Sequence, residues 1–477
     1  MPPALGDDDF LLSGETARAL FHGVAEPAPV VDFHTHLSAA DIAGDRRYET
    51  LTDLWLADDH YKWRAMRLAG VDEHLVTGDA DPWERFRAWA ATVARLVGNP
   101  LQVWTHLELR RVFGIDLALT SDTAAEVWEE ANRQLPRWSA RKLLAHFRVT
   151  IVATTDDPGD DLVPHGRLRE ETGPTSLRMV PTWRPDSAHR LLGDPPAWNA
   201  WVDRLEASTG VTVKDLASLL DALGRSHARF ASAGSRASDH GLECLPDQPP
   251  DTALADSTVR RLRWRGRQGE PASAGECRAL EVEVVSLAAR LAHAGDAVQQ
   301  LHLGARRDIS PRLLGAVGAD AGADAVGDER QGPGLARFLA TNEARGQLPR
   351  TVLYNLNPAD NAVFASMAGS FSRAGVPSLV QWGPPWWFND HEQGMRRHLR
   401  DLAQIGQLAG FVGMVADSRS FLSMSRHELF RRVLCDVIGR DVEGGRVPAD
   451  LQGLSAIVRG ICVDNAISYF GFVPPAP

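Results

Sequence analysis

The chain has 477 residues, 44% of them hydrophobic and 24% charged, and its 51 Lys and Arg against 62 Asp and Glu give a formal net charge of −11. This composition is typical of a packed globular protein, and the acidic balance disfavours nucleic acid as a partner because phosphate binding uses clustered Lys and Arg. No run approaches the roughly 18 apolar residues of a membrane span. The acidic N-terminus lacks a secretory signal, and the four cysteines are widely spaced. We therefore expect a cytoplasmic protein.

Short apolar runs recur along the chain and predict strands. Their lengths suit strands buried on both faces, and helical patterns such as residues 216–228 and 280–294 lie between most of them. This order predicts an α/β fold, a (β/α)8 barrel of the TIM type. The fourth run has the weakest strand pattern. The eight runs are residues 29–33, 149–154, 177–182, 236–241, 299–303, 351–355, 378–382 and 411–416.

Two stretches depart from this rhythm. Residues 39–146 are helix-patterned and hold seven of the 14 tryptophans. We predict a barrel start over residues 1–38, then a helical insertion subdomain over 39–146 with its own aromatic core, and the remaining barrel over 147–477. Residues 242–275 contain the basic run RRLRWRGR and predict an exposed excursion. A basic run on an acidic protein favours a solvated face over a binding patch.

Polar residues follow nearly every predicted strand. In a barrel the carboxyl ends of the strands converge on one face, where catalytic residues lie. His34 and His36 follow the first strand at i and i+2, so their side chains point the same way, and Asp417 follows the eighth strand, the neighbour of the first. An isolated His-x-His is a weak signal. Two histidines and one carboxylate with open positions are the pattern of a catalytic divalent metal site, such as that of Zn²⁺.

Longer strings resemble the uronate isomerase (glucuronate isomerase) family of the amidohydrolase superfamily. They extend in order over nearly the whole chain and include VDFHTHL (31–37), DHYKWRAMR (59–67), PTWRPD (181–186), RASDHG (236–241), QLHLGARR (300–307), WWFND (386–390) and FVGMVADSRSFLS (411–423). The resemblance implies reversible isomerisation of D-glucuronate to D-fructuronate and of D-galacturonate to D-tagaturonate. It also implies one divalent metal ion, usually zinc, on His34, His36 and Asp417. The family's other active-site residues fall on His60, Tyr61, Arg184, Asp239, His302, Arg307 and Arg419.

The chemistry of the reaction requires the same kinds of residues. Ring opening takes a base and an acid, which Asp239 could share with His34 or His302. Proton transfer from C2 to C1 passes through an enediolate, whose negative charge must be balanced by a metal ion or an arginine. Tyr61, Asp417 and Arg419 are the candidates for this step, and His60 precedes Tyr61 in the sequence. A bidentate arginine suits the sugar carboxylate. We expect this role for Arg184 or Arg307, with Arg184 the better candidate, and expect Trp386 to line the pocket.

Several alternatives remain open from the sequence. A mononuclear hydrolase or deaminase of the same superfamily would need only the two histidines and Asp417, but it would not explain the arginines or DHYKWRAMR. A sugar-binding protein without activity would have lost these residues. His60 and Tyr61 could be core residues of the insertion, and Arg184 could form a surface ion pair with Asp186. The small-molecule partner is a hexuronate. The sequence does not distinguish between the epimers of this sugar, between divalent metals, or between a monomer and a homo-oligomer.

Overall fold

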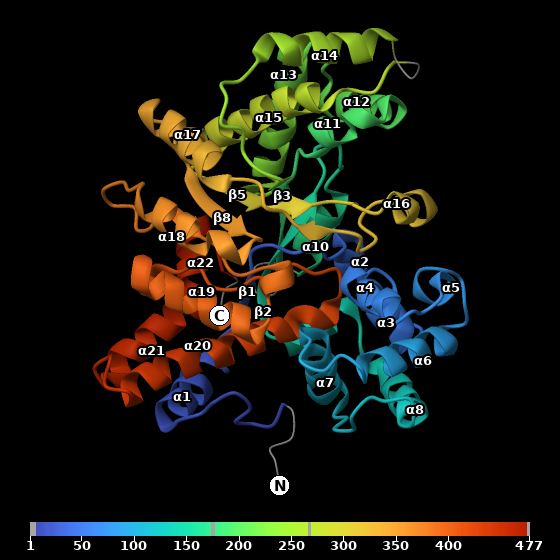
Figure 1. Ribbon diagram of the computed structural model, residues 1–477, viewed down its shortest axis with the longest axis vertical. Coiled ribbons are helices and arrows are strands. Elements are labelled where there is room, and N and C mark those ends of the chain that lie inside the picture. The colour runs from blue at the N-terminus through green and yellow to red at the C-terminus, as the bar shows by residue number, and fades with distance from the viewer. Residues whose placement is uncertain (1–5, 173–176, 266–268, 475–477) are drawn as a thin grey trace.

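A computed structural model describes residues 6–172, 177–265 and 269–474. At its centre is a curled parallel sheet of seven strands in the order β1-β2-β3-β4-β5-β8-β9 (Figure 1). The strands are β1 (Val30–Asp32), β2 (Val149–Asp156), β3 (Arg178–Trp183), β4 (Ala237–Leu242), β5 (Val298–Leu303), β8 (Arg350–Asn355) and β9 (Val380–Trp382). Each coincides with a predicted strand to within two residues, the weakly patterned fourth one included. The α/β class and seven of the eight predicted strands are therefore confirmed.

The eighth predicted strand, residues 411–416, is not a strand in the structure. Gly413 has a φ of +88°, outside the extended region, so the segment cannot continue a regular backbone ladder. Side chains attach the segment instead. The Gln381 carboxamide in β9 donates to the carbonyl oxygen of Gly410 at 3.0 Å, just before the segment, and accepts from the amide of Val412 at 3.1 Å. The Asp32 carboxylate in β1 accepts a hydrogen bond of 2.9 Å from the amide of Ala416. The segment thus lies between the first and last strands without pairing with either.

The helices of the first third lie between β1 and β2 and to the lower right in Figure 1. They are α2 (Ala39–Gly44), α3 (Leu51–Leu56), α4 (His60–Leu68), α5 (Glu73–Val76), α6 (Pro82–Val93), α7 (Pro100–Phe113), α8 (Ala124–Gln134) and α9 (Ala140–His146). Trp55, Trp89 and Trp104 of this segment belong to the same continuous hydrophobic cluster as Val31 and Ile151 of the sheet. The predicted aromatic core of this segment is therefore continuous with the core around the sheet, and the insertion subdomain over residues 39–146 stays a prediction.

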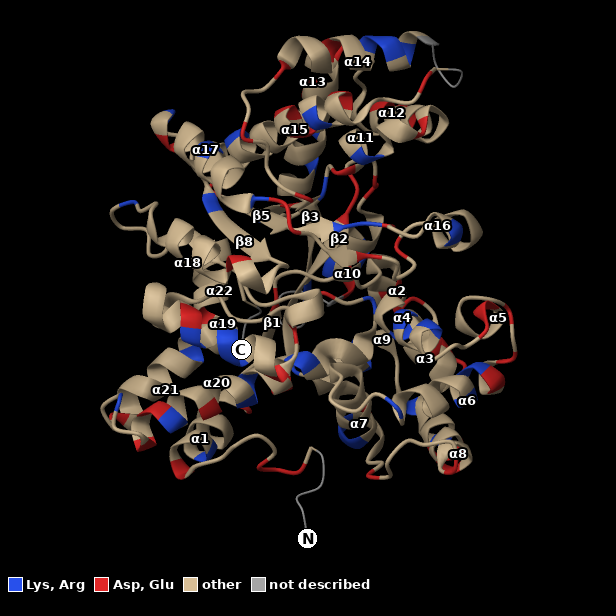
Figure 2. Cartoon of the chain, viewed as in Figure 1, with Lys and Arg blue, Asp and Glu red and all other residues tan. Residues whose placement is uncertain are grey.

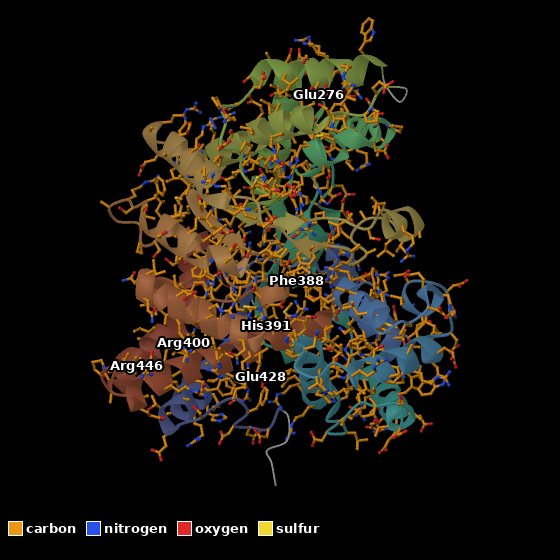
Figure 3. All side chains as sticks on the ribbon, in the orientation of Figure 1. Glu276, Phe388, His391, Arg400, Glu428 and Arg446 are labelled. Atoms are coloured by element: carbon orange, nitrogen blue, oxygen red, sulfur yellow. The ribbon has the colours of Figure 1, made fainter. Side chains whose placement is uncertain are left out.

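A second hydrophobic cluster lies at the top of Figure 1, in a layer of helices between β3 and β5. These helices are α11 (Ser187–Arg190), α12 (Pro195–Thr209), α13 (Leu216–Ser232), α14 (Thr252–Arg265) and α15 (Ala274–Ala294). Val259 and Leu262 of α14 are buried in this cluster, so the predicted exposed excursion is in part a packed helix. Basic residues gather at the end of α14 (Figure 2), where Arg261 pairs with Glu276 at 2.8 Å; Glu276 is labelled in Figure 3. Residues 266–268 of the basic run lie outside the described residues.

The remaining helices lie along the chain before β1, after β2 and after β5. They are α1 (Glu15–Leu20), α10 (Val163–Thr172), α16 (Pro311–Val317), α17 (Gln331–Ala344), α18 (Asn361–Gly369), α19 (Glu392–Ile405), α20 (Ser425–Glu443), α21 (Leu451–Arg459) and α22 (Asn465–Phe470). After β5, the short strands β6 (Ala305–Arg306) and β7 (Ala325–Val326) pair antiparallel and enclose the loop that carries Arg307 and Asp320. No helix in the described part of the chain is long and apolar enough to cross a membrane.

Candidate active site

A pocket of about 200 Å³ opens beside the carboxyl ends of the strands. Every residue predicted for the site lines it except Asp239, which lies directly behind the wall. The lining residues are His34, His36, Asp58, Asp59, His60, Tyr61, Thr155, Arg184, Arg190, His302, Arg307, Asp320, Trp386, Trp387, Asp417, Ser418, Arg419 and Arg426. Segments more than 380 residues apart in the chain, such as His34 and Asp417, therefore meet in one place.

His34, His36 and Asp417 form a cluster whose donor atoms fit a divalent metal ion. Oδ1 of Asp417 lies 3.1 Å from Nε2 of His34 and 3.3 Å from Nε2 of His36. All three ligand atoms lie within 4.8 Å of one another. In a tetrahedral zinc site with bonds of about 2.0–2.1 Å, neighbouring ligand atoms are roughly 3.3 Å apart. The cluster thus has the donor types and the spacing that such an ion requires.

Two of the three side chains in the cluster, His36 and Asp417, have the protonation states that metal binding requires. Burial lowers the pKa of His36 to about 4, although Asp417 opposes the shift. Burial alone would raise the pKa of Asp417, but hydrogen bonds with His34 and His36 hold it well below its usual range. For His34, Asp239 and Asp417 outweigh burial and raise the pKa. At neutral pH His36 is neutral and Asp417 ionised, the forms in which these side chains bind metals.

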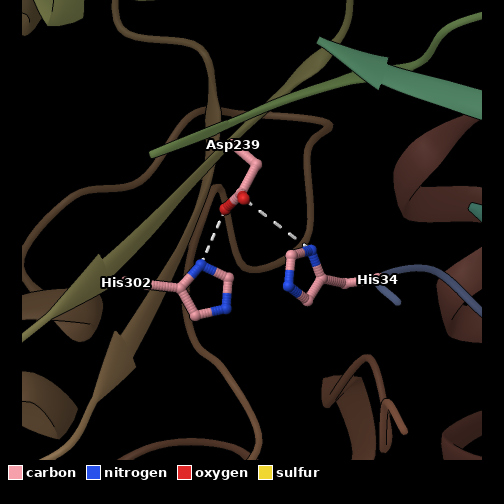
Figure 4. Close-up of side chains that lie close together, drawn as sticks. All are labelled: His34, Asp239 and His302. Carbon is pink, nitrogen blue, oxygen red and sulfur yellow. Dashed lines mark hydrogen bonds and ion pairs between the residues drawn. The ribbon is translucent and has the colours of Figure 1, made fainter. Parts of the chain in front are cut away.

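Asp239 in β4 organises the wall behind this cluster. Its Oδ1 lies 2.7 Å from Nδ1 of His302, and its Oδ2 lies 2.8 Å from Nη1 of Arg184 and 4.0 Å from Nδ1 of His34. Figure 4 shows the two histidine rings on different sides of this carboxylate. His34, Asp239 and His302 are close enough to be a second candidate metal set. Because Asp239 already pairs with Arg184 and His302, the set containing Asp417 fits an ion better.

The contact with Asp239 fixes how His302 faces the pocket. Burial would raise the pKa of Asp239, but Arg184 and His302 hold it well below its usual range, so the carboxylate is ionised and accepts a hydrogen bond from Nδ1. Burial lowers the pKa of His302, which is therefore neutral at pH 7. Its Nε2 is buried and has no hydrogen-bond partner among the described residues. His302 thus presents a free lone pair in the pocket wall.

Arg184 does pair with Asp186, at 2.9 Å between Nε and Oδ2, as one reading of the sequence allowed. The pair is not at the surface, however, because the Arg184 side chain is only 14% exposed and also contacts Asp239. Nη2 of Arg184 lies where a β-carbon on Gly241 would clash, so a glycine in β4 makes room for the guanidinium. The structure therefore joins β3 and β4 through one buried cation and two carboxylates.

Helix α4 brings His60 and Tyr61 to the pocket. Asp59 caps the helix by accepting hydrogen bonds from the amides of Tyr61 and Lys62, which fixes the start of α4. Burial, followed by the charge of Arg419, lowers the pKa of His60 to about 4. Burial and the nearby Asp390 raise the pKa of Tyr61 well above 10. Tyr61 is therefore protonated at neutral pH and can donate a hydrogen bond.

Other pocket residues were not identified from the sequence. Arg426 in α20 is buried, pairs with Asp390 at 3.1 Å and stacks on Trp104 with 4.0 Å between guanidinium and ring centroid. Asp320 contacts two predicted arginines, with 3.1 Å to Arg419 and 3.7 Å to Arg307. The third unforeseen residue is Arg190, at the end of α11. Asp390 belongs to the motif WWFND, whereas Arg426, Asp320 and Arg190 belong to none of the motifs found in the sequence.

Comparisons with known proteins agree with the resemblance. The chain matches the glucuronate isomerase family over residues 3–470. It is 44% identical to a uronate isomerase of Vibrio vulnificus over 469 residues, covering 97% of this chain and 98% of that one. It is 43% identical to a uronate isomerase of Yersinia enterocolitica at the same coverage. A crystal structure of uronate isomerase from Thermotoga maritima superposes with a TM-score of 0.89 at 35% identity, over 97% of this chain and 99% of that one.

Proposed function

Because the chain belongs to the glucuronate isomerase family, we propose that this pocket is the site at which it interconverts the aldose and ketose forms of a hexuronate. The chain is an aldose–ketose isomerase, and D-glucuronate and D-galacturonate are the expected substrates. The observation that carries the assignment of the site is the meeting of His34, His36 and Asp417 with a group of arginines in one pocket. Proton transfer and recognition of a sugar acid need these two kinds of residue side by side.

Ring opening is the first step, because a hexuronate is mainly a closed hemiacetal. His302 is placed to accept the proton of the anomeric hydroxyl on its free Nε2, since Nδ1 is held by Asp239 at 2.7 Å. Asp239 stabilises the imidazolium that forms, as a carboxylate does behind a catalytic histidine, and the imidazolium then gives this proton to the ring oxygen as the bond between that oxygen and C1 breaks. Asp239 thus acts through His302.

The second step moves a proton from C2 to C1. Asp417 is ionised and can act as the base, while Tyr61 is protonated and can donate to the sugar oxygen or carbon that receives the proton. The guanidinium of Arg419, held by Asp320 at 3.1 Å, supplies positive charge for the enediolate. His60 lies beside Tyr61, with 4.8 Å between ring centroids, and is neutral at pH 7, so it can exchange a proton with the substrate.

His34, His36 and Asp417 would hold one divalent metal ion, which we propose is zinc because two imidazoles and a carboxylate are typical ligands of catalytic zinc. When bound, it would supply positive charge for the substrate oxygens. We place the sugar against Arg184, Arg307, His302 and Trp386. The indole of Trp386 is 4% exposed and lies 4.7 Å from the His302 ring, so it closes this side of the pocket to water.

The proposal is tested by incubating metal-loaded protein with D-glucuronate and D-galacturonate in D₂O and following ketose formation and deuterium incorporation at C1 by NMR. We expect ketose from at least one uronate, with C1 deuteration reporting the proton-transfer step. The variant Trp264→Ala should form ketose as the wild type does, since Trp264 is 90% exposed on α14, outside the pocket. The hydrolase or deaminase alternative predicts instead the release of acid or ammonia from amide substrates, with no ketose.

A further inference from the structure

Asp417 has a backbone conformation that residues with a β-carbon seldom adopt. Its φ is +42°, in the left-handed region, where the β-carbon crowds the following carbonyl oxygen. Such a residue persists only where its surroundings hold it in place. The preceding residue, Ala416, is fully buried, so both of its backbone polar groups need partners within the protein. The contacts that hold the Ala416 backbone therefore also orient the Asp417 carboxylate.

Two pairs of buried side chains bind Ala416 from opposite sides. Nη1 of Arg426 donates a hydrogen bond of 2.8 Å to the Ala416 carbonyl oxygen and lies 3.1 Å from Oδ2 of Asp390. Oδ1 of Asp32 accepts a hydrogen bond of 2.9 Å from the Ala416 amide and lies 3.4 Å from Nε2 of His427. Arg426 and His427 are neighbours in the first turn of α20, so the start of this helix supports the backbone on both sides.

Arg426 also lies against Tyr61, another group that we place in the proton transfer. Its guanidinium lies 4.9 Å from the centroid of the Tyr61 ring and 4.0 Å from that of Trp104. Arg426 is 1% exposed and lines the pocket. One guanidinium therefore contacts both the Tyr61 ring and the peptide that precedes Asp417.

A purely structural role is the alternative, because another buried arginine of α20 makes contacts of the same kinds. Arg432 is also 1% exposed, lies 2.8 Å from Glu428, donates to two backbone carbonyl oxygens and lies 4.2 Å from the centroid of the Phe21 ring. It does not line the pocket. What distinguishes Arg426 is that the peptide it binds precedes a left-handed residue of the site.

We propose that Arg426 is a positioning residue that fixes Asp417 and Tyr61 in the geometry required for proton transfer from C2 to C1. This inference rests on the proposed function. A displacement of about 1 Å at a reacting group reduces turnover about 100-fold. The sugar-binding side of the pocket is held by other contacts, such as that of Arg184 with Asp239 at 2.8 Å. Arg426 should therefore affect kcat more than KM.

The test separates positioning from stability, since Arg426→Met leaves the buried Asp390 without its counter-ion. The double variant Arg426→Met/Asp390→Asn removes this uncompensated charge. We expect its kcat to fall by about 30-fold or more, with KM changed less than about threefold. Arg426→Lys should recover part of kcat, because an ammonium group can still donate to the Ala416 carbonyl oxygen. Arg432→Met is the matched control and should keep the kcat and KM of the wild type even where it lowers Tm.

Two further readouts do not depend on turnover. Zinc affinity, measured by competition with a chelating dye, should weaken by about tenfold or more in the double variant, because Asp417 is no longer held toward His34 and His36. Hydrogen exchange, followed by mass spectrometry, should be faster in the peptide that contains Ala416 and Asp417. Both quantities should be unchanged in the control variant.

A double variant with the kcat, zinc affinity and hydrogen exchange of the wild type would overturn the proposal. Equal losses of kcat in the double variant and in Arg432→Met would also overturn it, because they would reflect stability alone. Absence of turnover in the wild type would instead refute the proposed function, while zinc affinity and hydrogen exchange would still test whether Arg426 positions Asp417.

Discussion

Replacing Arg426 by Met removes the counter-ion of a carboxylate that water does not reach. Asp390 is 1% exposed, its Oδ2 lies 3.1 Å from Nη1 of Arg426, and its Oδ1 has no hydrogen-bond partner among the described residues. Leaving one member of a buried ion pair without its partner costs about 3–5 kcal/mol of folding free energy. With about 2.1 cal/mol/K of unfolding entropy per residue over 477 residues, this corresponds to a fall in Tm of about 3–5 °C.

The size of this effect should depend on pH. Burial raises the pKa of Asp390 to about 7 even with Arg426 beside it, and loss of Arg426 raises that pKa further. The folded state then keeps a proton that the unfolded chain releases above pH 4, so the stability of the variant decreases as pH rises. The slope approaches about 1.4 kcal/mol per pH unit between the unfolded and folded pKa values. Arg426→Met should therefore be more destabilised at pH 8.5 than at pH 5.5.

The assay is chemical unfolding at these two pH values, for the wild type, Arg426→Met, Asp390→Asn and the double variant. Trp104 stacks on Arg426 at 4.0 Å but is one of 14 tryptophans, so the fluorescence change reports unfolding of the whole chain. The double variant should recover most of the stability lost in Arg426→Met and lose the additional pH dependence of that variant, because the Asp390 carboxyl is then absent. Additive losses in the double variant, or equal losses at both pH values, would refute the reasoning.

Three further results are expected. Asp417→Asn should abolish both turnover and stoichiometric metal binding, measured by ketose assay and elemental analysis, and substantial turnover in this variant would exclude Asp417 from both roles. Arg184→Gln leaves two buried carboxylates without their shared cation, so the midpoint of urea unfolding should shift by the equivalent of about 3 kcal/mol; an unchanged midpoint would contradict the buried pairing. Burial raises the pKa of Asp156 to about 7, so this carboxyl contributes to a fall in wild-type stability from pH 4 to 7, and Asp156→Asn should show a smaller fall, because Asp390 contributes a fall of its own. Parallel pH profiles for the two proteins would argue against a proton on Asp156.

Most of the fold could be predicted from the sequence because buried parallel strands are short, apolar and separated by helical patterns. Where the prediction failed, backbone conformation decided the outcome. Residues 411–416 have the composition of a strand, but Gly413 takes a φ of +88° and side chains of Gln381 and Asp32 replace the ladder. Composition alone does not reveal that side-chain hydrogen bonds take the place of backbone pairing here.

The site was predictable where its residues belong to motifs at strand ends, as with His34, His36 and Asp417. The residues that were missed reach the pocket in other ways. Arg426 comes from the long helix α20, outside every motif at a strand end. Asp320 comes from a Gly- and Ala-rich loop, and Arg64 and Arg67 of α4 hold this loop by donating hydrogen bonds to its carbonyl groups. Their roles depend on tertiary contacts that no local sequence pattern encodes.

The attachment of residues 411–416 by side chains bears on how the sheet would respond to a metal ion at His34, His36 and Asp417. His34 and His36 follow one edge of the seven-stranded sheet, and Asp417 ends the segment that faces this edge. A metal ion bound by all three would reinforce the backbone hydrogen bonds from Asp417 to His34 and from His36 to Ser418, which join the two sides of the interval in which the described sheet has no ladder. The same ion would then contribute to closing the fold, and the amides of this segment would report its binding through slower hydrogen exchange.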